Sequence, residues 1–210
     1  MAYRDFTLRR AQVDLGLTVQ TPESLFADIP SRPVTPATAA WIAEYRPLAT
    51  AVNSEKARAE FLVAPILGEA WRSDKKRIAL FSGVTFNVDA AAELVGVCDF
   101  ILGRPPQLDY VSAPVMMITE VKNETIAGGF GQCAAELVAA QRFNAAHNSD
   151  ITTMYGCVTN GVEWKFMRLN ETTLDIDQSD YLIDDPDRIL GIILHFVGLA
   201  PLPVAALTPR

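Results

Sequence analysis

Three ionisable residues lie in or beside two strongly apolar segments. Asp99 interrupts LVGVCDFIL, and Glu120 and Lys122 lie near the end of PVMMITEVK. A charged group taken out of water is costly unless it is paired or binds a metal ion. In a strand, Glu120 and Lys122 would point the same way, about 7 Å apart, because faces alternate and each residue rises about 3.3 Å. Two neighbouring carboxylates would suit Mg²⁺ or Mn²⁺, and the ammonium would orient or deprotonate a water molecule.

The elements around these residues must bring them together. If the strands that carry them pair, Asp99, Glu120 and Lys122 converge at one end of a sheet. Asn160-Gly161 is a strong hairpin signal between two later strands. The predicted elements, in order, are strands at 77–88, 94–102 and 114–122, a helix at about 130–147, and strands TTMYGCVT, VEWKFMRL and TLDID.

Helices are predicted on both sides of these strands. A short amphipathic helix at about 8–15 precedes an extended arm at 18–36. Thr35-Pro36 can start a helix that should end or bend near Pro47, and Asn53 or Ser54 can cap the next one, kinked at Pro65. The last helix begins at Asp185-Pro186. The domain prediction is a single domain over 1–210, with an amino-terminal helical arm (1–52), a core (53–176), and a carboxy-terminal helix and tail (185–210).

The composition indicates a globular intracellular protein. Its 210 residues are 50% hydrophobic and 20% charged, enough for one domain with a substantial core. The order of the predicted elements makes this an α/β domain with a mixed sheet covered by helices. Three cysteines without a C-x-x-C pair and two separated histidines predict reduced thiols and no zinc site. We find no apolar signal core and no clean stretch long enough to cross a bilayer. We therefore expect a soluble, cytoplasmic protein with no membrane partner.

Asp99 followed by Glu120-Val121-Lys122 resembles the PD-(D/E)XK nuclease superfamily. Its restriction endonuclease-like core has the order αβββαβ, and the resemblance covers roughly 53–169. The segment NSEKARAEFLVAPIL is similar to the first helix in the amino-terminal nuclease domain of type I restriction R subunits. The chain is also similar to a family of bacterial proteins of about this length that share FSG-x-x-FNV, CDF and GQC-x-AE, for which no substrate is assigned.

The resemblance implies a nuclease that uses Mg²⁺ or Mn²⁺ to hydrolyse phosphodiester bonds, with DNA as the expected substrate. Glu60 is the preferred first-helix ligand and Glu55 the other candidate. They point about 140° apart on an ideal helix, so at most one serves. The implied metal ligands are Asp99, Glu120, the Val121 carbonyl and Glu60. The implied catalytic residues are Asp99, Glu120, Lys122 and Gln132.

Within that implied set, Lys122 would position the attacking water, and Gln132 would contact the lysine or the nucleic acid backbone. Two positions depart from the family pattern. Cys98 replaces the proline before the motif aspartate, and Glu136 stands where the RecB-like branch carries a tyrosine four residues after Gln132.

Other interpretations stay open. A non-catalytic binding module on the same fold fits the net charge of −7, and the apolar segment RILGIILHFVGL could add a homodimer surface. A metal-dependent hydrolase with another substrate would carry a similar site. Asp99 could instead cap a turn, and Glu120 and Lys122 could form an ion pair on an edge strand, worth under about 1 kcal/mol if exposed.

Overall fold

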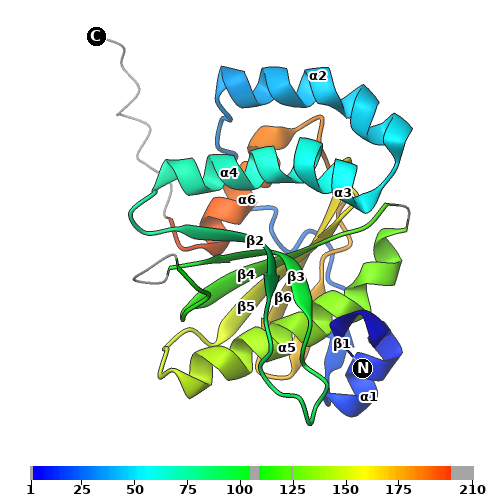
Figure 1. The fold of residues 1–210 in the computed structure, drawn as a ribbon, viewed down its shortest axis with the longest axis vertical. Coiled ribbons are helices and arrows are strands. Elements are labelled where there is room, and N and C mark those ends of the chain that lie inside the picture. The colour runs from blue at the N-terminus through cyan, green and yellow to red at the C-terminus, as the bar shows by residue number, and fades with distance from the viewer. Residues whose placement is uncertain (1, 105–108, 124, 200–210) are drawn as a thin grey trace.

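The computed structural model describes residues 2–104, 109–123 and 125–199 (Figure 1). Its helices are α1 (Leu8–Asp14), α2 (Pro36–Val52), α3 (Glu55–Arg58), α4 (Ala64–Ser73), α5 (Phe130–Ala146) and α6 (Pro186–Phe196). Its short turns are η1 (Tyr3–Asp5), η2 (Ala59–Val63) and η3 (Ile126–Gly129). Its strands are β1 (Thr18–Gln20), β2 (Ala79–Thr85), β3 (Val97–Gly103), β4 (Val115–Val121), β5 (Thr153–Thr159), β6 (Glu163–Asn170), β7 (Thr173–Ile176) and β8 (Tyr181–Leu182). The predicted carboxy-terminal tail lies outside the described residues from 200 onward, as does part of the predicted turn, at 105–108.

Within this described part, eight strands form one mixed sheet. Their order is β1-β7-β6-β5-β4-β3-β2, with β8 beside β6. β4 is parallel to β5 and β1 is parallel to β7, whereas the other neighbours are antiparallel. The chain passes from β4 to β5 through α5, as a parallel pair requires. The predicted α/β class, a mixed sheet flanked by helices, is confirmed.

Helices cover both faces of the sheet (Figure 1). On one face, α5 packs on β4 and β5, and α1 packs on α5. On the other face, α4 packs between α2 and α6. The seven residues of β4 are all buried, which is the burial expected of a central strand. The edge-strand interpretation of Glu120 and Lys122 is therefore wrong.

The sequence predicts that the helix beginning at Thr35-Pro36 ends or bends near Pro47, and the structure shows that it does not end there. The Thr35 side chain caps it as predicted, but α2 continues through Pro47 to Val52, and Asn53 closes it with a left-handed backbone (φ 51°). Pro47 and Ala43 are both exposed. The carbonyl of Ala43, which loses its helical donor at the proline, can therefore be solvated by water.

The predicted interruption at Pro65 takes the form of a π-helical turn. Ser54 caps α3, η2 follows as the π-helical turn, and Pro65 lies in the first turn of α4. A π-helical turn inserts extra backbone into a helix, so the break in hydrogen bonding comes just before the proline. Tyr45 of α2 stacks on Phe61 of η2, with ring centroids 5.3 Å apart, and holds this turn against α2.

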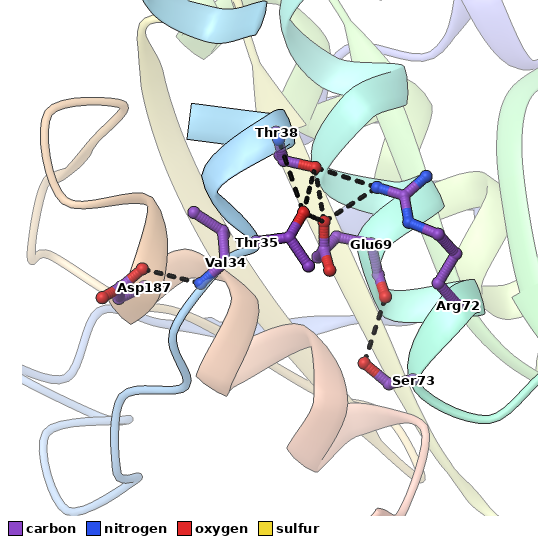
Figure 2. Close-up of polar contacts among 7 residues, drawn as sticks. All are labelled: Val34, Thr35, Thr38, Glu69, Arg72, Ser73 and Asp187. Atoms are coloured by element: carbon purple, nitrogen blue, oxygen red, sulfur yellow. Dashed lines mark hydrogen bonds and ion pairs between the residues drawn. The ribbon is translucent and has the colours of Figure 1, made fainter. Parts of the chain in front are cut away.

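A buried carboxylate joins α2 to α4 (Figure 2). Glu69 of α4 is only 6% exposed, and its Oε2 accepts hydrogen bonds from the hydroxyls of Thr35 (2.9 Å) and Thr38. Arg72 donates to the same oxygen at 2.8 Å and also to the Thr38 hydroxyl. These bonds outweigh burial, so the pKa of Glu69 is lowered and the carboxylate stays charged. This polar cluster fixes α4 against α2 in the helical layer on this face of the sheet.

The amino-terminal arm joins the sheet. The helix at 8–15 is confirmed as α1, and the first residues of the predicted extended arm, 18–20, form β1, which pairs in parallel with β7 (Thr18 opposite Thr173). The arm thus adds an edge strand to the sheet.

The apolar carboxy-terminal helix packs inside the molecule. Asp185 caps α6 as predicted, and Ile189, Ile192 and Ile193 are fully buried in the core beneath α4. They offer no surface to a second copy of the chain, so the physical reason for predicting a homodimer is lost. Across residues 2–104, 109–123 and 125–199, no helix combines the length and apolarity that membrane crossing requires.

Candidate active site

The structure brings four of the predicted site residues together. β3 and β4 are antiparallel and their register pairs Phe100 with Thr119, so Asp99 and Glu120 follow at the same end of the two strands. Lys122 lies one residue beyond β4, and its backbone amide donates to the Thr159 carbonyl at 2.8 Å. Gln132 reaches the same place from the first turn of α5.

A buried asparagine fixes α5 against β4. The side chain of Asn144 accepts a hydrogen bond from the Val115 amide at 2.9 Å and donates to the Val115 carbonyl at 2.7 Å. The two bonds hold one end of the helix at one end of the strand. The opposite end of the helix, with Gln132, consequently faces the end of β4 that carries Glu120.

Hydrogen bonds connect the site residues in a chain. Asp99 Oδ2 accepts from the Val121 backbone amide at 2.8 Å, so the aspartate does bind backbone, though across two strands. Lys122 Nζ donates to Glu120 Oε1 at 2.6 Å and to Gln132 Oε1 at 3.1 Å. This arrangement fixes the ammonium between a carboxylate and an amide.

The carboxylates are poorly compensated. Glu120 is 3% exposed, and burial, together with the neighbouring charge of Asp99, raises its pKa to about 8 despite the ion pair with Lys122. The pKa of Asp99 is also raised, first by burial. Burial lowers the pKa of Lys122, but the charge and hydrogen bond of Glu120 outweigh it, so the net shift is upward and the ammonium stays protonated.

Glu136 is a site member that sequence reasoning did not select. It lies on α5, is fully buried, and its Oε1 accepts from Gln132 Nε2 at 3.1 Å. Burial raises the pKa of Glu136 well above its ordinary range, and the charge of Glu120 adds to the shift. The sequence signal for Glu136 was its spacing, because it follows Gln132 by four residues and therefore lies one helical turn further along the same face.

Two adjoining pockets meet at Asp99. One, of about 510 Å³, is lined by Glu120, Lys122 and Gln132 together with residues of the amino terminus. The other, of about 350 Å³, is lined by Glu60 and Val121 and by Ser82 and Gly83 of β2. Asp99 and Glu55 line both pockets.

Geometry favours Glu55 over Glu60 as the first-helix carboxylate. The side chain of Glu60 is 53% exposed and pairs with Lys56 at 2.7 Å. Glu60 lines only the smaller of the two pockets. Glu55 lines both pockets, and its charge raises the pKa of Asp99 and of Glu120. Among the residues that the structure describes, no three His, Cys, Asp or Glu side chains are grouped so that they could hold a metal ion.

Comparison of the chain with protein-family models and with curated proteins gave no match.

Proposed function

We propose that this protein is a Mg²⁺- or Mn²⁺-dependent nuclease of the PD-(D/E)XK type that hydrolyses phosphodiester bonds of DNA. The observation that carries the proposal is the convergence of Asp99, Glu120, Lys122 and Gln132 at a pocket of about 510 Å³. Two carboxylates beside one ammonium that is hydrogen-bonded in place suit phosphodiester hydrolysis.

The residues present fit a divalent cation. Glu120 Oε2 is buried and has no hydrogen-bond partner within the described residues. A buried, unsatisfied carboxylate oxygen beside a second carboxylate is a costly arrangement that a bound cation would relieve. Asp99 and Glu120 would hold the ion, assisted by Glu55 and by the Val121 carbonyl. When bound, the ion would stabilise charge on a phosphoryl oxygen and lower the pKa of a water molecule.

The chain's own residues supply positioning. Lys122, held by Glu120 and Gln132, can donate a hydrogen bond to the attacking water or to a phosphate oxygen from a fixed place. Gln132 is oriented by Glu136, because Glu136 Oε1 accepts a hydrogen bond from the Gln132 amide at 3.1 Å. The fixed lysine reduces the reorganisation needed during reaction.

The order of elements supports a restriction endonuclease-like core. The helical stretch α3–η2–α4, then β2, β3 and β4, then α5 and β5, follows the order αβββαβ between Glu55 and Thr159. The pairing also suits that core, because the strands that bear the two carboxylates are central neighbours and α5 lies beside them.

The decisive experiment is a cleavage panel. Supercoiled plasmid, linear duplex, single-stranded DNA and RNA are incubated with Mg²⁺ or Mn²⁺ and with wild type, Lys122→Ala or Lys76→Ala. Lys76 is an exposed lysine outside both pockets and serves as the matched control. We expect wild type and Lys76→Ala to cut DNA, and Lys122→Ala to be slower by about 100-fold or more, as for loss of a positioned proton donor.

Two results would change the assignment. A Lys122→Ala protein that cuts as fast as wild type would remove Lys122 from the mechanism. No cleavage by any of the three, together with no metal-dependent shift in melting temperature, would favour the non-catalytic binding module.

A further inference from the structure

The first residues of the chain are anchored beside the candidate active site. Tyr3 is 1% exposed, and its hydroxyl donates to the carbonyls of Phe86 (2.7 Å) and Leu94 (3.1 Å). The Tyr3 amide also donates to the Val95 carbonyl at 3.1 Å. These contacts bind η1 to the segment that leads into β3, so its position follows that of Asp99.

Two glycines allow this close approach. A Cβ at Gly96 would lie 2.9 Å from Tyr3 Cδ2, and a Cβ at Gly131 would overlap the backbone of Phe6 and Thr7. Gly131 immediately precedes Gln132 in α5. The amino-terminal segment therefore packs directly on the helix turn that carries a site residue, and forms one wall of the larger pocket.

Arg4 places a cation in that wall. It is the middle residue of η1, its side chain is exposed, and it lines the same pocket as Asp99, Glu120 and Lys122. The neighbouring Asp5 is engaged by the Ala2 amide at 2.8 Å. Within residues 2–104, 109–123 and 125–199, Arg4 forms no ion pair, whereas Lys122 is committed to Glu120.

We propose that Arg4 binds a phosphate of the nucleic acid substrate in this pocket and holds the strand against the carboxylates and Lys122. The inference rests on the proposed nuclease function and assigns a substrate-binding residue to it. A polyanion approaching Glu55, Asp99 and Glu120 meets repulsion, which a nearby guanidinium would offset. The planar guanidinium donates two parallel hydrogen bonds to phosphate oxygens, which gives orientation as well as attraction.

The test compares Arg4→Gln with Arg9→Gln. Arg9 is an exposed arginine on α1 outside the pocket, so both variants lose the same charge from the same part of the chain. Binding of short fluorescein-labelled DNA, single-stranded or duplex, is followed by fluorescence anisotropy with Mg²⁺, in a Lys122→Ala background that does not cut the probe. Steady-state cleavage is measured with Lys122 intact.

We expect Arg4→Gln to weaken DNA binding about five- to eightfold at 0.1 M salt and to lower the slope of log K against log salt by about 0.7–0.9, the contribution of one phosphate contact. KM should rise with little change in kcat, because the contact is made equally in ground and transition states. Arg4→Lys should restore the salt slope, since it keeps the charge, but only part of the affinity, since it loses the two parallel hydrogen bonds. Arg9→Gln should behave as the unsubstituted protein.

The two proposals can fail separately. Wild-type cleavage together with equal binding by Arg4→Gln and Arg9→Gln would overturn the role of Arg4 and leave the nuclease intact. A wild-type protein that neither cuts nor binds DNA would overturn both. Binding without cleavage, lost in Arg4→Gln alone, would keep Arg4 as a nucleic acid contact and remove the catalytic assignment.

Discussion

At the scale of residues, one ammonium faces two carboxylates. Lys122 Nζ donates hydrogen bonds to Glu120 and Gln132, while Asp99 accepts one from the backbone amide of Val121. When both carboxylates are ionised, one negative charge at the end of β3 and β4 is uncompensated. Burial first, and the neighbouring charge of Asp99 second, therefore raise the pKa of Glu120 to about 8.

A raised pKa makes a prediction about stability without metal. Between pH 4.5, the ordinary value for the unfolded chain, and pH 8, folded Glu120 binds more protons than unfolded Glu120. Its contribution to stability is thus fully present below pH 4.5 and is lost as pH rises towards 8. Replacing it by glutamine removes this dependence. The unfolding free energy of Glu120→Gln, relative to that of wild type, should therefore rise by on the order of 1–4 kcal/mol between pH 5 and pH 8, as measured by urea unfolding in chelator.

Glu44→Gln is the control for this pH series. Glu44 is an exposed carboxylate on α2, so the same charge is removed from the surface. Its unfolding free energy should run parallel to that of wild type at every pH. If Glu120→Gln also runs parallel to wild type, Glu120 is not the group that titrates in this range.

At the scale of elements, the helical layer depends on a buried carboxylate. Glu69→Ala would leave the hydroxyls of Thr35 and Thr38 and the guanidinium of Arg72 without their shared acceptor (Figure 2). We expect a loss of about 2–3 kcal/mol in unfolding free energy at neutral pH, as for a buried, charge-assisted hydrogen bond. Because the pKa of Glu69 is lowered, the contribution is present above the unfolded value and is lost as pH falls through the folded value.

The comparison variant is Glu60→Ala. Glu60 also pairs with a cation of the same helical stretch, but both partners are mostly exposed. The denaturant midpoint of Glu60→Ala, measured by chemical unfolding in chelator, should equal that of wild type. Equal losses for the two variants would mean that burial of Glu69 adds nothing to the joint between α2 and α4.

The sequence supports the long elements better than the short ones. β3, β4 and α5 are long apolar or periodic segments, and pairing of the two strands was enough to predict that Asp99 and Glu120 converge. β1 and β8 have three and two residues, and β1 pairs with a strand far along the chain, so no local pattern could indicate it. Strand β8 is likewise defined by its pairing with another strand, β6, and not by a local sequence pattern.

Two site details depend on packing or on backbone irregularity. The angle of about 140° between Glu55 and Glu60 assumes an ideal α-helix, but the π-helical turn that begins at Ala59 changes the angular relation between Glu55 and the residues after it. Glu136 reads as an ordinary helical glutamate in the sequence. Only the contact of α5 with β4 and β5 shows that it is buried.

At the scale of the whole molecule, the net charge of −7 has two separable consequences. Self-repulsion lowers stability, and any salt screens it. A site with unsatisfied carboxylates, by contrast, responds to a specific divalent ion. The two effects differ because screening depends on ionic strength alone, whereas binding saturates and stabilises the folded state by RT ln(1 + [L]/Kd).

Mg²⁺ should therefore raise the melting temperature beyond what salt achieves. At a concentration about 100 times Kd, binding contributes about 2.7 kcal/mol, or roughly 5–10 °C for a chain of this size. The measurement is a thermal melt in Mg²⁺ or Mn²⁺ against KCl of equal ionic strength. Asp99→Asn should lose the extra rise, because one of the two carboxylates is gone, while Asp28→Asn, an exposed carboxylate outside both pockets, should keep it. A rise that KCl reproduces, or that Asp99→Asn retains, would reflect overall charge and would contradict a metal site at the end of β3 and β4.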